Sequence, residues 1–388
     1  MLEKTREAVI VAYGRSAVAK SKKGYFINRH PIEWAEDTLE GVFAKVPQLD
    51  RREIDDVALG CARLVNKCAK NVARLITLRA GMENVSAVSV NRFCASGLEA
   101  ISICSNKIAV GDIDIALAGG VECMSMDQSL IPGYQDEVLN QMVPGAYMEM
   151  GITAENVAAM KHVTREEMDA FSVESHRKAA AAQEKGYLNR SIIPVKGNDK
   201  EGNEIMAELD QGIRPGSTME ILGNLKPCFK EDGIVTAGNS SQTNDAAAYV
   251  ILMSRQKAEE LGLKPIAKLV NYATAACDPA YMGLGPTFAV PKVMKRSGYT
   301  VDDMDVIELN EAFAAQAIPC IRELGFDPEK VNPWGGAIAL GHPMGATGAF
   351  LTIKALDYMQ IFGGKRALVT MCVGGGQGAA GIFEMLND

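Results

Sequence analysis

Apolar residues fall along the chain in short runs, and these runs alternate with segments in which apolar residues recur at helical spacing. Continuous runs of alanine and β-branched residues are typical of strands buried on both faces. Such runs occupy residues 8–12, 54–59, 113–117, 265–270, 306–309, 367–371 and 380–383. Helical spacing is found at residues 31–43, 71–80 and 165–185. Strands that alternate with helices predict a layered α/β core in which helices cover the sheet.

The alternation stops between residues 122 and 238, where methionines cluster and polar loops are frequent. We interpret this stretch as an inserted loop domain carried on the core. The predicted N-terminal half begins with residues 1–121 and is completed by residues 239–265, with the insertion at 122–238 between them. The predicted C-terminal half is residues 266–388. The second half loosely repeats the first as strand, small-residue turn with one reactive side chain, helix and strand, which predicts a duplicated fold.

The composition is that of a soluble globular protein. Of 388 residues, 47% are hydrophobic and 23% are charged, and no run of about 18 apolar residues could span a membrane. The net charge of −8 disfavours nucleic acid and anionic membranes as partners. Nine cysteines, an odd number without zinc-site spacing, predict reduced thiols and no metal. With no recognisable leader, we expect a cytoplasmic location.

Cys94 is the first candidate for chemistry. It lies between a strand-like stretch that ends at Val90 and a helical pattern that begins at Leu98, and the three residues after it are small. A thiol at a helix N-terminus faces unpaired N–H groups and the positive end of the helix dipole, and both favour the thiolate. The stretch therefore predicts an activated nucleophile, with a buried structural cysteine as the alternative.

A histidine in the second half could serve Cys94 as a base. His342 stands at a predicted helix start among glycines and other small residues, whereas His30, His162 and His176 have polar or charged neighbours and are expected at the surface. In that tight setting His342 could take the proton of Cys94. A structural histidine is the alternative.

Two further stretches add reactive side chains. Cys372 opens a glycine-rich loop at residues 371–378, MCVGGGQG, which lacks the Lys-Ser/Thr of a nucleotide-binding loop. Asn310, in residues 310–313, could hold a water or donate to an oxyanion, or simply cap a strand. Two thiols, a histidine and an asparagine indicate acyl transfer with a carbon–carbon bond made or broken. One sulfur would carry the acyl group, and the other would move a proton at carbon.

Eight motifs then stand in the order found in thiolases: NRFCASGL, GGVECMS, MGITAENVA, TAGNSSQTND, DPAYMGLGP, ELNEAFAAQ, GGAIALGHPMGATG and MCVGGGQG. The motifs lie between residues 91 and 378, and the resemblance extends from about residue 8 to the C-terminus. The chain therefore resembles the thiolase family, and most closely its degradative 3-ketoacyl-CoA thiolases. This resemblance implies an α/β fold of two similar halves in five layers, α-β-α-β-α, with an inserted loop domain, assembled as a homodimer or homotetramer.

The resemblance also implies the roles of the candidate residues. Cys94 would attack the 3-keto carbon and carry the acyl group, with His342 as its activator. His342 and a water held by Asn310 would form an oxyanion hole for the acetyl enolate. Cys372 would protonate that enolate, and the backbone N–H groups of Cys94 and Gly374 would form a second oxyanion hole at the acyl group.

For the insertion and its surroundings, the resemblance implies a binding site for CoA, which is a substrate and not a tightly bound cofactor. Arg214 matches a position that contacts the adenine-nucleotide end, and Ser241 matches one that meets the pantetheine arm. Phe229, Met150 and Phe313 would line the tunnel.

Three positions depart from the family pattern. Glu149 replaces a histidine that biosynthetic relatives often carry beside the pantetheine, which weakens a short-chain biosynthetic assignment. Ala246 replaces a glycine, and Phe350 replaces an arginine near the helix that follows His342, where the change is expected to alter packing or subunit contacts.

The leading hypothesis is CoA-dependent cleavage of 3-ketoacyl-CoA to acetyl-CoA and a shortened acyl-CoA, in fatty acid β-oxidation. A biosynthetic acetoacetyl-CoA thiolase with the same four catalytic residues is an alternative within enzymes. A ketosynthase or hydroxymethylglutaryl-CoA synthase needs no second cysteine, so Cys372 disfavours both. A non-catalytic acyl-CoA or lipid carrier on the same scaffold need not retain Cys94, His342 and Cys372 together.

Overall fold

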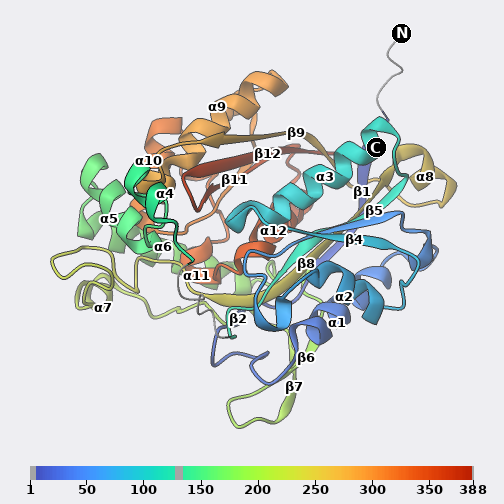
Figure 1. Cartoon of the computed structure of the whole chain (residues 1–388), viewed down its shortest axis with the longest axis horizontal. Coiled ribbons are helices and arrows are strands. Elements are labelled where there is room, and N and C mark those ends of the chain that lie inside the picture. The colour runs from blue at the N-terminus through green and yellow to red at the C-terminus, as the bar shows by residue number, and fades with distance from the viewer. Residues whose placement is uncertain (1–5, 127–133, 387–388) are drawn as a thin grey trace.

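The protein was analysed as a computed structural model that describes residues 6–126 and 134–386 (Figure 1). Two sheets alternate with three layers of helices. In spatial order, the first sheet contains β1 (Ala8–Arg15), β8 (Asn244–Ser254), β5 (Ile115–Glu122), β3 (Asp56–Gly60) and β4 (Ser86–Val90). The second contains β9 (Ala267–Ala276), β12 (Gln377–Met385), β11 (Arg366–Val373) and β10 (Val306–Leu309). A single register contact between β1 and β9 joins the two sheets at one edge.

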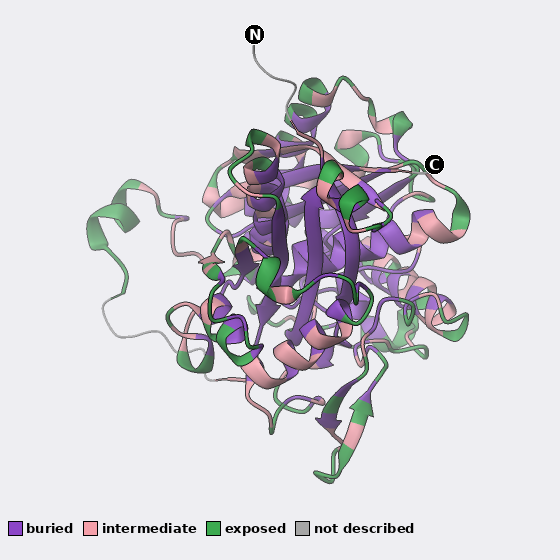
Figure 2. Ribbon diagram, turned by 90° about the vertical axis from the view of Figure 1, so that its right-hand side faces the viewer, coloured by how far each residue is buried: buried purple, intermediate pink, exposed green. Residues whose placement is uncertain are grey.

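Helices α3 (Ser96–Val110) and α12 (Met344–Phe362) form the middle layer and pack on each other and on both sheets. Both are buried around most of their circumference, which suits helices that are apolar on nearly every side. Helices α1 (Pro31–Phe43) and α2 (Val72–Arg79) cover the outer face of the first sheet, and α9 (Gly285–Ser297) and α10 (Ala314–Leu324) cover that of the second. Figure 2 shows the result, buried strands at the centre with partly exposed helices around them.

The two halves have the same topology. In the first, β1 and β8 are antiparallel, β8 and β5 are antiparallel, and β5, β3 and β4 are parallel. The second repeats this order with β9, β12, β11 and β10, and a parallel bridge from Ile307 to Val331 takes the place of the fifth strand. The predicted duplication is thus seen as a matching order of strands. Cys94 follows β4 into α3, and His342 follows Val331 towards α12, so the two residues occupy corresponding positions.

The segment between β5 and β8 carries its own helices and a hairpin. They are α4 (Glu137–Met142), α5 (Met150–Lys161), α6 (Arg165–Glu184), β6 (Val195–Asn198), β7 (Glu204–Ala207) and α7 (Met219–Gly223). The helix predicted at 165–185 is α6, and residues 199–203 join β6 to β7. Every residue of α4 is exposed, and in Figure 2 this helix stands away from the body.

Two local predictions are wrong. His176, expected at the surface, is buried on α6 with only 2% of its area exposed, and its Nδ1 accepts a hydrogen bond from the Arg214 backbone N–H at 3.2 Å. Its polar sequence neighbours lie on the other sides of the helix. The polar character of residues 14–29 predicts a loop, but β1 continues to Arg15, and the stretch contains β2 (Ala19–Lys20), which pairs with β8. Within the described ranges, the helices are too short or too polar to cross a membrane.

Candidate active site

The turn that carries Cys94 is held by its own side chains. β4 ends at Val90, and a single 3-10 turn, Phe93–Ala95, leads into α3. Phe93 has a φ of 44°, a left-handed conformation that is uncommon for a bulky residue. Two hydrogen bonds hold it there: its N–H donates to Asn91 Oδ1 at 2.9 Å, and its carbonyl accepts from the Ser96 hydroxyl at 2.7 Å. The strained turn directs Cys94 out of the sheet, where its exposure is intermediate.

The turn that carries His342 is held by the other half of the molecule. The His342 backbone N–H donates to Asn244 Oδ1 at 3.0 Å and to the Gln242 carbonyl at 3.1 Å. The preceding residue must be glycine, because its φ is 104° and a Cβ there would lie 2.3 Å from Asn244 Oδ1. Short α11 (Ala337–Leu340) precedes this turn, and α12 begins two residues after His342.

The two turns bring a thiol and an imidazole into contact. Cys94 Sγ lies 3.1 Å from His342 Nε2, and His342 Nδ1 lies 2.7 Å from the hydroxyl of Thr347 on α12. When Nδ1 carries the proton and Thr347 Oγ1 accepts it, Nε2 has its lone pair towards the thiol. This is the tautomer that a general base needs.

Burial keeps both groups neutral in the resting site. Desolvation lowers the pKa of His342 to about 4 and raises the pKa of Cys94 to about 12, although the N–H groups of Gly374 and Cys94 itself, directed at the sulfur, act in the opposite sense. The thiolate expected from the helix N-terminus is therefore wrong for the resting protein. A helix terminus contributes about 0.3–1 kcal/mol, whereas each pKa unit is about 1.4 kcal/mol, so desolvation dominates. Nucleophilicity must come from proton transfer to His342.

Asn310 and Cys372 complete the cluster. Asn310 follows β10, and its Nδ2 lies 3.5 Å from His342 Nε2, while its buried Oδ1 has no hydrogen-bond partner among the described residues. Cys372 lies in β11 opposite Gly378 and is fully buried. Desolvation raises the pKa of Cys372 well above its usual value, and the nearby Cys94 sulfur acts in the same direction. A buried amide oxygen beside a neutral imidazole suits a bound water or a substrate oxygen.

Comparison with known proteins shows the family of the chain. Residues 8–256 match the N-terminal domain of thiolases, and residues 263–385 match the C-terminal domain. The chain is 44% identical to a 3-ketoacyl-CoA thiolase of Bacillus subtilis (strain 168), over 98% of this chain and 100% of that protein. The chain belongs to the thiolase family.

Other thiolases differ in their names but not in the extent of the match. The chain is 42% identical to the beta-ketothiolase BktB of Cupriavidus necator, over 98% of this chain and all of the relative. The crystal structure of the Bacillus anthracis acetyl-CoA acetyltransferase superposes with a TM-score of 0.90 at 36% identity, over 99% of this chain and 100% of that one. The duplicated five-layer fold predicted from the motifs is therefore confirmed.

Three apolar side chains predicted for the tunnel of the thiolase gather around the glycine loop. Met150, the first residue of α5, has its sulfur 3.8 Å from the point that a Cβ of Gly374 would occupy. Phe229 packs so closely on Gly151 that a Cβ added to Gly151 would lie 2.1 Å from the Phe229 ring. The Phe229 ring also makes an edge contact with the ring of Phe313, with the two ring centroids 6.1 Å apart. Met150 and Phe229 remain 38% and 36% exposed. Both side chains are therefore accessible to an apolar ligand.

The two residues predicted to contact CoA lie on either side of the His342 turn. The Ser241 N–H donates to the Ala312 carbonyl at 2.9 Å, which places Ser241 next to Asn310 and Phe313. Arg214 is exposed, and the chain just before it packs on α11, where the Gly212 carbonyl accepts from Gln242 Nε2 at 2.9 Å. Burial lowers the pKa of Lys20, and the charge of nearby Arg214 lowers it further. This side of the thiolase is therefore basic.

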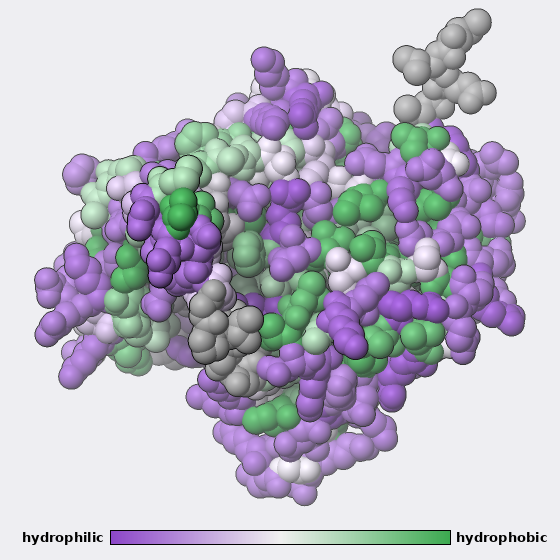
Figure 3. Space-filling view, viewed as in Figure 1, coloured by the Kyte–Doolittle hydropathy of each residue, from purple (hydrophilic) through white to green (hydrophobic). Residues whose placement is uncertain are grey.

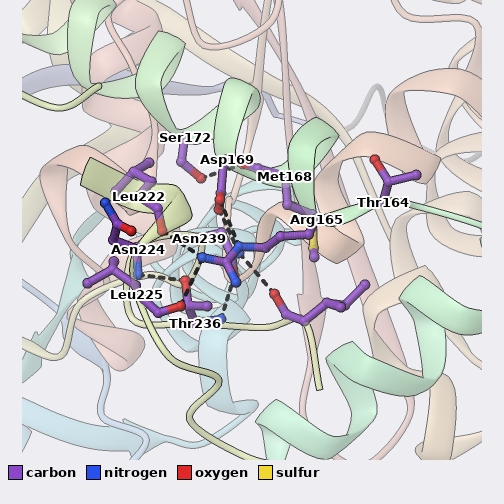
Figure 4. A network of polar contacts seen from close by, with 12 residues as sticks. Thr164, Arg165, Met168, Asp169, Ser172, Leu222, Asn224, Leu225, Thr236 and Asn239 are labelled. Atoms are coloured by element: carbon purple, nitrogen blue, oxygen red, sulfur yellow. Dashed lines mark hydrogen bonds and ion pairs between the residues drawn. The ribbon is translucent and has the colours of Figure 1, made fainter. Parts of the chain in front are cut away.

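A polar network holds the turn at residues 236–242 against the loop that carries Asn310. Figure 4 shows the Arg165 guanidinium between Asp169, at 2.7 Å, and the carbonyls of Leu222 and Leu225, at 2.6 and 3.0 Å. Asp169 accepts from Asn239 Nδ2 at 3.0 Å, and the Asn239 carbonyl accepts from the backbone N–H of residue 314 at 2.9 Å. The insertion is thereby tied to the loop that follows β10.

Sequence reasoning missed Thr347 and Asn244, which touch His342 directly. Thr347 lies five residues after His342, within GHPMGATG, and the position of a hydroxyl one helical turn into α12 was an available signal. Asn244 lies almost 100 residues away, and its contact depends on the packing of the two halves. Phe350, where the family pattern has arginine, is buried beneath the Arg15 guanidinium at 4.8 Å, so its contact is made within the chain. No cluster of metal-ligating side chains occurs in the part of the chain that is described.

Proposed function

We propose that the protein cleaves 3-ketoacyl-CoA with CoA, giving acetyl-CoA and an acyl-CoA shortened by two carbons. The observation that carries this proposal is the 3.1 Å contact between Cys94 Sγ and His342 Nε2, with Cys372 on β11, a strand that contacts the Cys94 turn. A neutral imidazole can accept the Cys94 proton, and a neutral thiol can donate one to carbon. The names of the relatives, 3-ketoacyl-CoA thiolase among them, point the same way.

In the first half-reaction, the Cys94 proton passes to His342 while the sulfur attacks the 3-keto carbon. The bond between C2 and C3 of the substrate then breaks, and Cys372 gives its proton to C2 of the enolate, which leaves as acetyl-CoA. The site now holds an acyl-thioester on Cys94, a protonated His342 and a thiolate at Cys372. Atoms and charge balance without any added cofactor.

In the second half-reaction, the thiol of CoA gives its proton to the Cys372 thiolate and attacks the acyl carbon. Cys94 leaves and takes back the proton from His342. The N–H groups of Cys94 and Gly374 are directed at the position of the sulfur, so they suit the oxyanion of the acyl carbon. Asn310 and His342 suit the enolate oxygen through a water. Loss of one such donor costs about 3–4 kcal/mol.

CoA would enter past the insertion, residues 122–238, with the two halves 1–121 plus 239–265 and 266–388 supplying the catalytic turns. Ser241 would meet the pantetheine arm, and Arg214 with its basic neighbour would meet the nucleotide end. Phe229, Met150 and Phe313 would line the path between them. A working location in the reducing cytoplasm fits cysteines that form no disulfide within the described ranges.

We further propose that two copies associate through the edge of the first sheet. Among the described strands, β4 pairs only with β3, and Val88 on it is 44% exposed. Leu75 and Leu78 on neighbouring α2 are 39% and 41% exposed, and Figure 3 shows apolar patches among polar residues where Figure 1 labels β4 and α2. An open apolar edge is a template for pairing with a second copy. Val88→Lys should shift the sedimentation of the protein to that of a monomer.

A series of thiolysis rates on 3-ketoacyl-CoA substrates of increasing chain length tests the function. We expect cleavage of acetoacetyl-CoA and of longer substrates, with an acyl adduct on Cys94 detectable by mass spectrometry. The relatives named acetyl-CoA acetyltransferase favour a second candidate, the condensation of two acetyl-CoA molecules. A preference for four-carbon over eight-carbon substrate would support that candidate. Absence of cleavage at every length would refute both.

A further inference from the structure

The second oxyanion hole is built from two halves of the chain. The Cys94 N–H belongs to the turn after β4, and the Gly374 N–H belongs to the loop between β11 and β12. Their separation therefore depends on how firmly the two halves are joined at this point. Gly374 is followed by two further glycines with φ of 78° and 76°, so the loop has no side chain of its own until Gln377.

Gln377 joins the glycine loop to the Cys94 turn. Its Nε2 donates to the Gly374 carbonyl at 3.3 Å, and its Oε1 accepts from Arg92 Nη1 at 3.1 Å. Because a guanidinium can only donate, the amide oxygen must face Arg92, and the amide nitrogen must then face Gly374. Arg92 stands two residues before Cys94, so the connection from one donor of the hole to the other passes through only two side chains.

Arg92 is itself fixed at its other edge. Its Nε donates to Glu99 Oε2 at 2.5 Å, and the same oxygen accepts from the Tyr272 hydroxyl at 2.5 Å. The backbone N–H of Arg92 donates to Ser96 Oγ at 2.9 Å, within the turn that holds Cys94. The Arg92 side chain is 32% exposed, so the chain of contacts lies at the rim of the site and not in the core.

We propose that Arg92 and Gln377 are positioning residues that set the distance between the N–H groups of Cys94 and Gly374. The inference rests on the function proposed above, because it concerns the oxyanion formed when Cys94 takes or gives up an acyl group. The proposal requires neither side chain to contact the substrate. Their loss should slow steps that pass through that oxyanion, and it should spare chemistry at the Cys94 sulfur that forms no oxyanion.

The test compares two reactions of the same sulfur. Acylation of Cys94 by acetyl-CoA, followed by mass spectrometry in a single turnover, passes through the oxyanion. Alkylation of Cys94 by iodoacetamide needs the thiol and His342 but forms no oxyanion. Gln377→Met keeps the length of the side chain and removes both hydrogen bonds, and it should slow acylation about tenfold while leaving alkylation and KM unchanged.

Four further variants sharpen the result. Arg92→Met should slow acylation to a similar extent, and the double variant should be no slower than the slower single one, because both remove the same connection. Arg92→Lys keeps a donor and should recover part of the rate. Arg79→Met, at a half-exposed ion pair on outer helix α2, is the matched control and should change neither reaction.

Equal acylation rates in the native protein and Gln377→Met would overturn the inference, and so would alkylation that slows in the same proportion as acylation. Additive losses in the double variant would also contradict it. If the native protein takes no acyl group from acetyl-CoA, the proposed function fails, and the inference fails with it. The native protein therefore separates the two failures.

Discussion

The Cys94 turn and the His342 turn occupy corresponding positions in two halves of identical topology, yet they are stabilised in opposite ways. The Cys94 turn is half-exposed and is held by residues within five positions of the thiol. The His342 turn is buried and is held by Asn244 and Gln242 from the other half. A nucleophile has to meet substrate, whereas a base has to keep one ring orientation. The duplicated scaffold therefore meets two needs, because one turn is stabilised by its neighbours in sequence and the other by residues of the opposite half.

Removal of the second thiol should give the largest effect of the changes that probe this comparison. Cys372→Ala removes the proton donor for C2, so thiolysis should fall by a factor of about 10²–10⁴. Acylation of Cys94 by acetyl-CoA, which requires no new bond to hydrogen at carbon, should persist more strongly than thiolysis. Stopped-flow thiolysis and the mass of the trapped adduct measure the two. Equal losses in both would show that proton transfer to carbon is not the main contribution of Cys372.

The support of each turn can be removed separately. Asn244→Ala leaves the buried His342 N–H with one partner fewer and removes a donor to the Ala19 carbonyl, which lies 3.0 Å from Asn244 Nδ2. An unmet buried group costs about 1–3 kcal/mol, so we expect kcat to fall about 30-fold, with a lower melting temperature.

Asn91→Ala is the counterpart at the exposed turn. Solvent can replace the lost bond to Phe93, so the fall in kcat should be about threefold. Thermal melts separate destabilised protein from misplaced catalytic groups. Equal effects of the two asparagine variants would remove the distinction between a locally held turn and a turn held across the halves.

Acid should weaken the fold through the buried histidines. Desolvation lowers the pKa of His342 and His176 to about 4, below the usual value near 6.5. Between pH 4 and pH 6.5 these histidines are protonated in the unfolded chain but neutral in the folded chain. Their contribution to the free energy of unfolding is therefore fully present above about pH 6.5 and is lost as the pH falls towards 4. Each histidine should contribute about 1–3 kcal/mol to this loss.

Urea unfolding of the native protein and of His176→Asn, at pH 7.5 and pH 4.5, measures the pH effect. The variant should show a smaller difference between the two pH values. The pH dependence that remains in the variant should come from His342, since His176 lies outside the catalytic turns. An unchanged pH dependence would show that His176 takes up no proton in this range when the chain unfolds.

Loss of the Thr347 hydroxyl should have an effect between those of the two asparagine variants. Thr347→Val keeps the shape of the side chain but removes the partner of His342 Nδ1, at a cost of about 1 kcal/mol, or about fivefold in kcat. Thr347→Ser keeps the hydroxyl and should retain most of the activity. The measurement is kcat for thiolysis as a function of pH. A valine variant with native activity would show that the buried ring keeps its orientation by packing alone.

The strands were predictable because each is a local pattern. Residues 306–309 form β10 and residues 31–43 form α1 as the spacing of apolar residues indicated. Ends were less predictable, since β5 continues past residue 117 to Glu122 through two glycines whose pairing depends on neighbouring strands. His176 was placed wrongly because its burial depends on what packs against one face of α6, which neighbours in sequence do not reveal.

The amino-acid sequence by itself determined the chemistry available to this protein: two thiols, one histidine in a glycine turn and an asparagine, in motifs that also identify the family. Only the tertiary structure decided how that chemistry is set. It desolvates Cys94 so that the thiol rests protonated, it joins Asn244 to His342, and it ties Arg92 to Gln377 across the halves. Each of these is a contact between groups far apart in the chain or a consequence of burial. Neither can be read from local spacing, because both arise only when the two sheets close around α3 and α12.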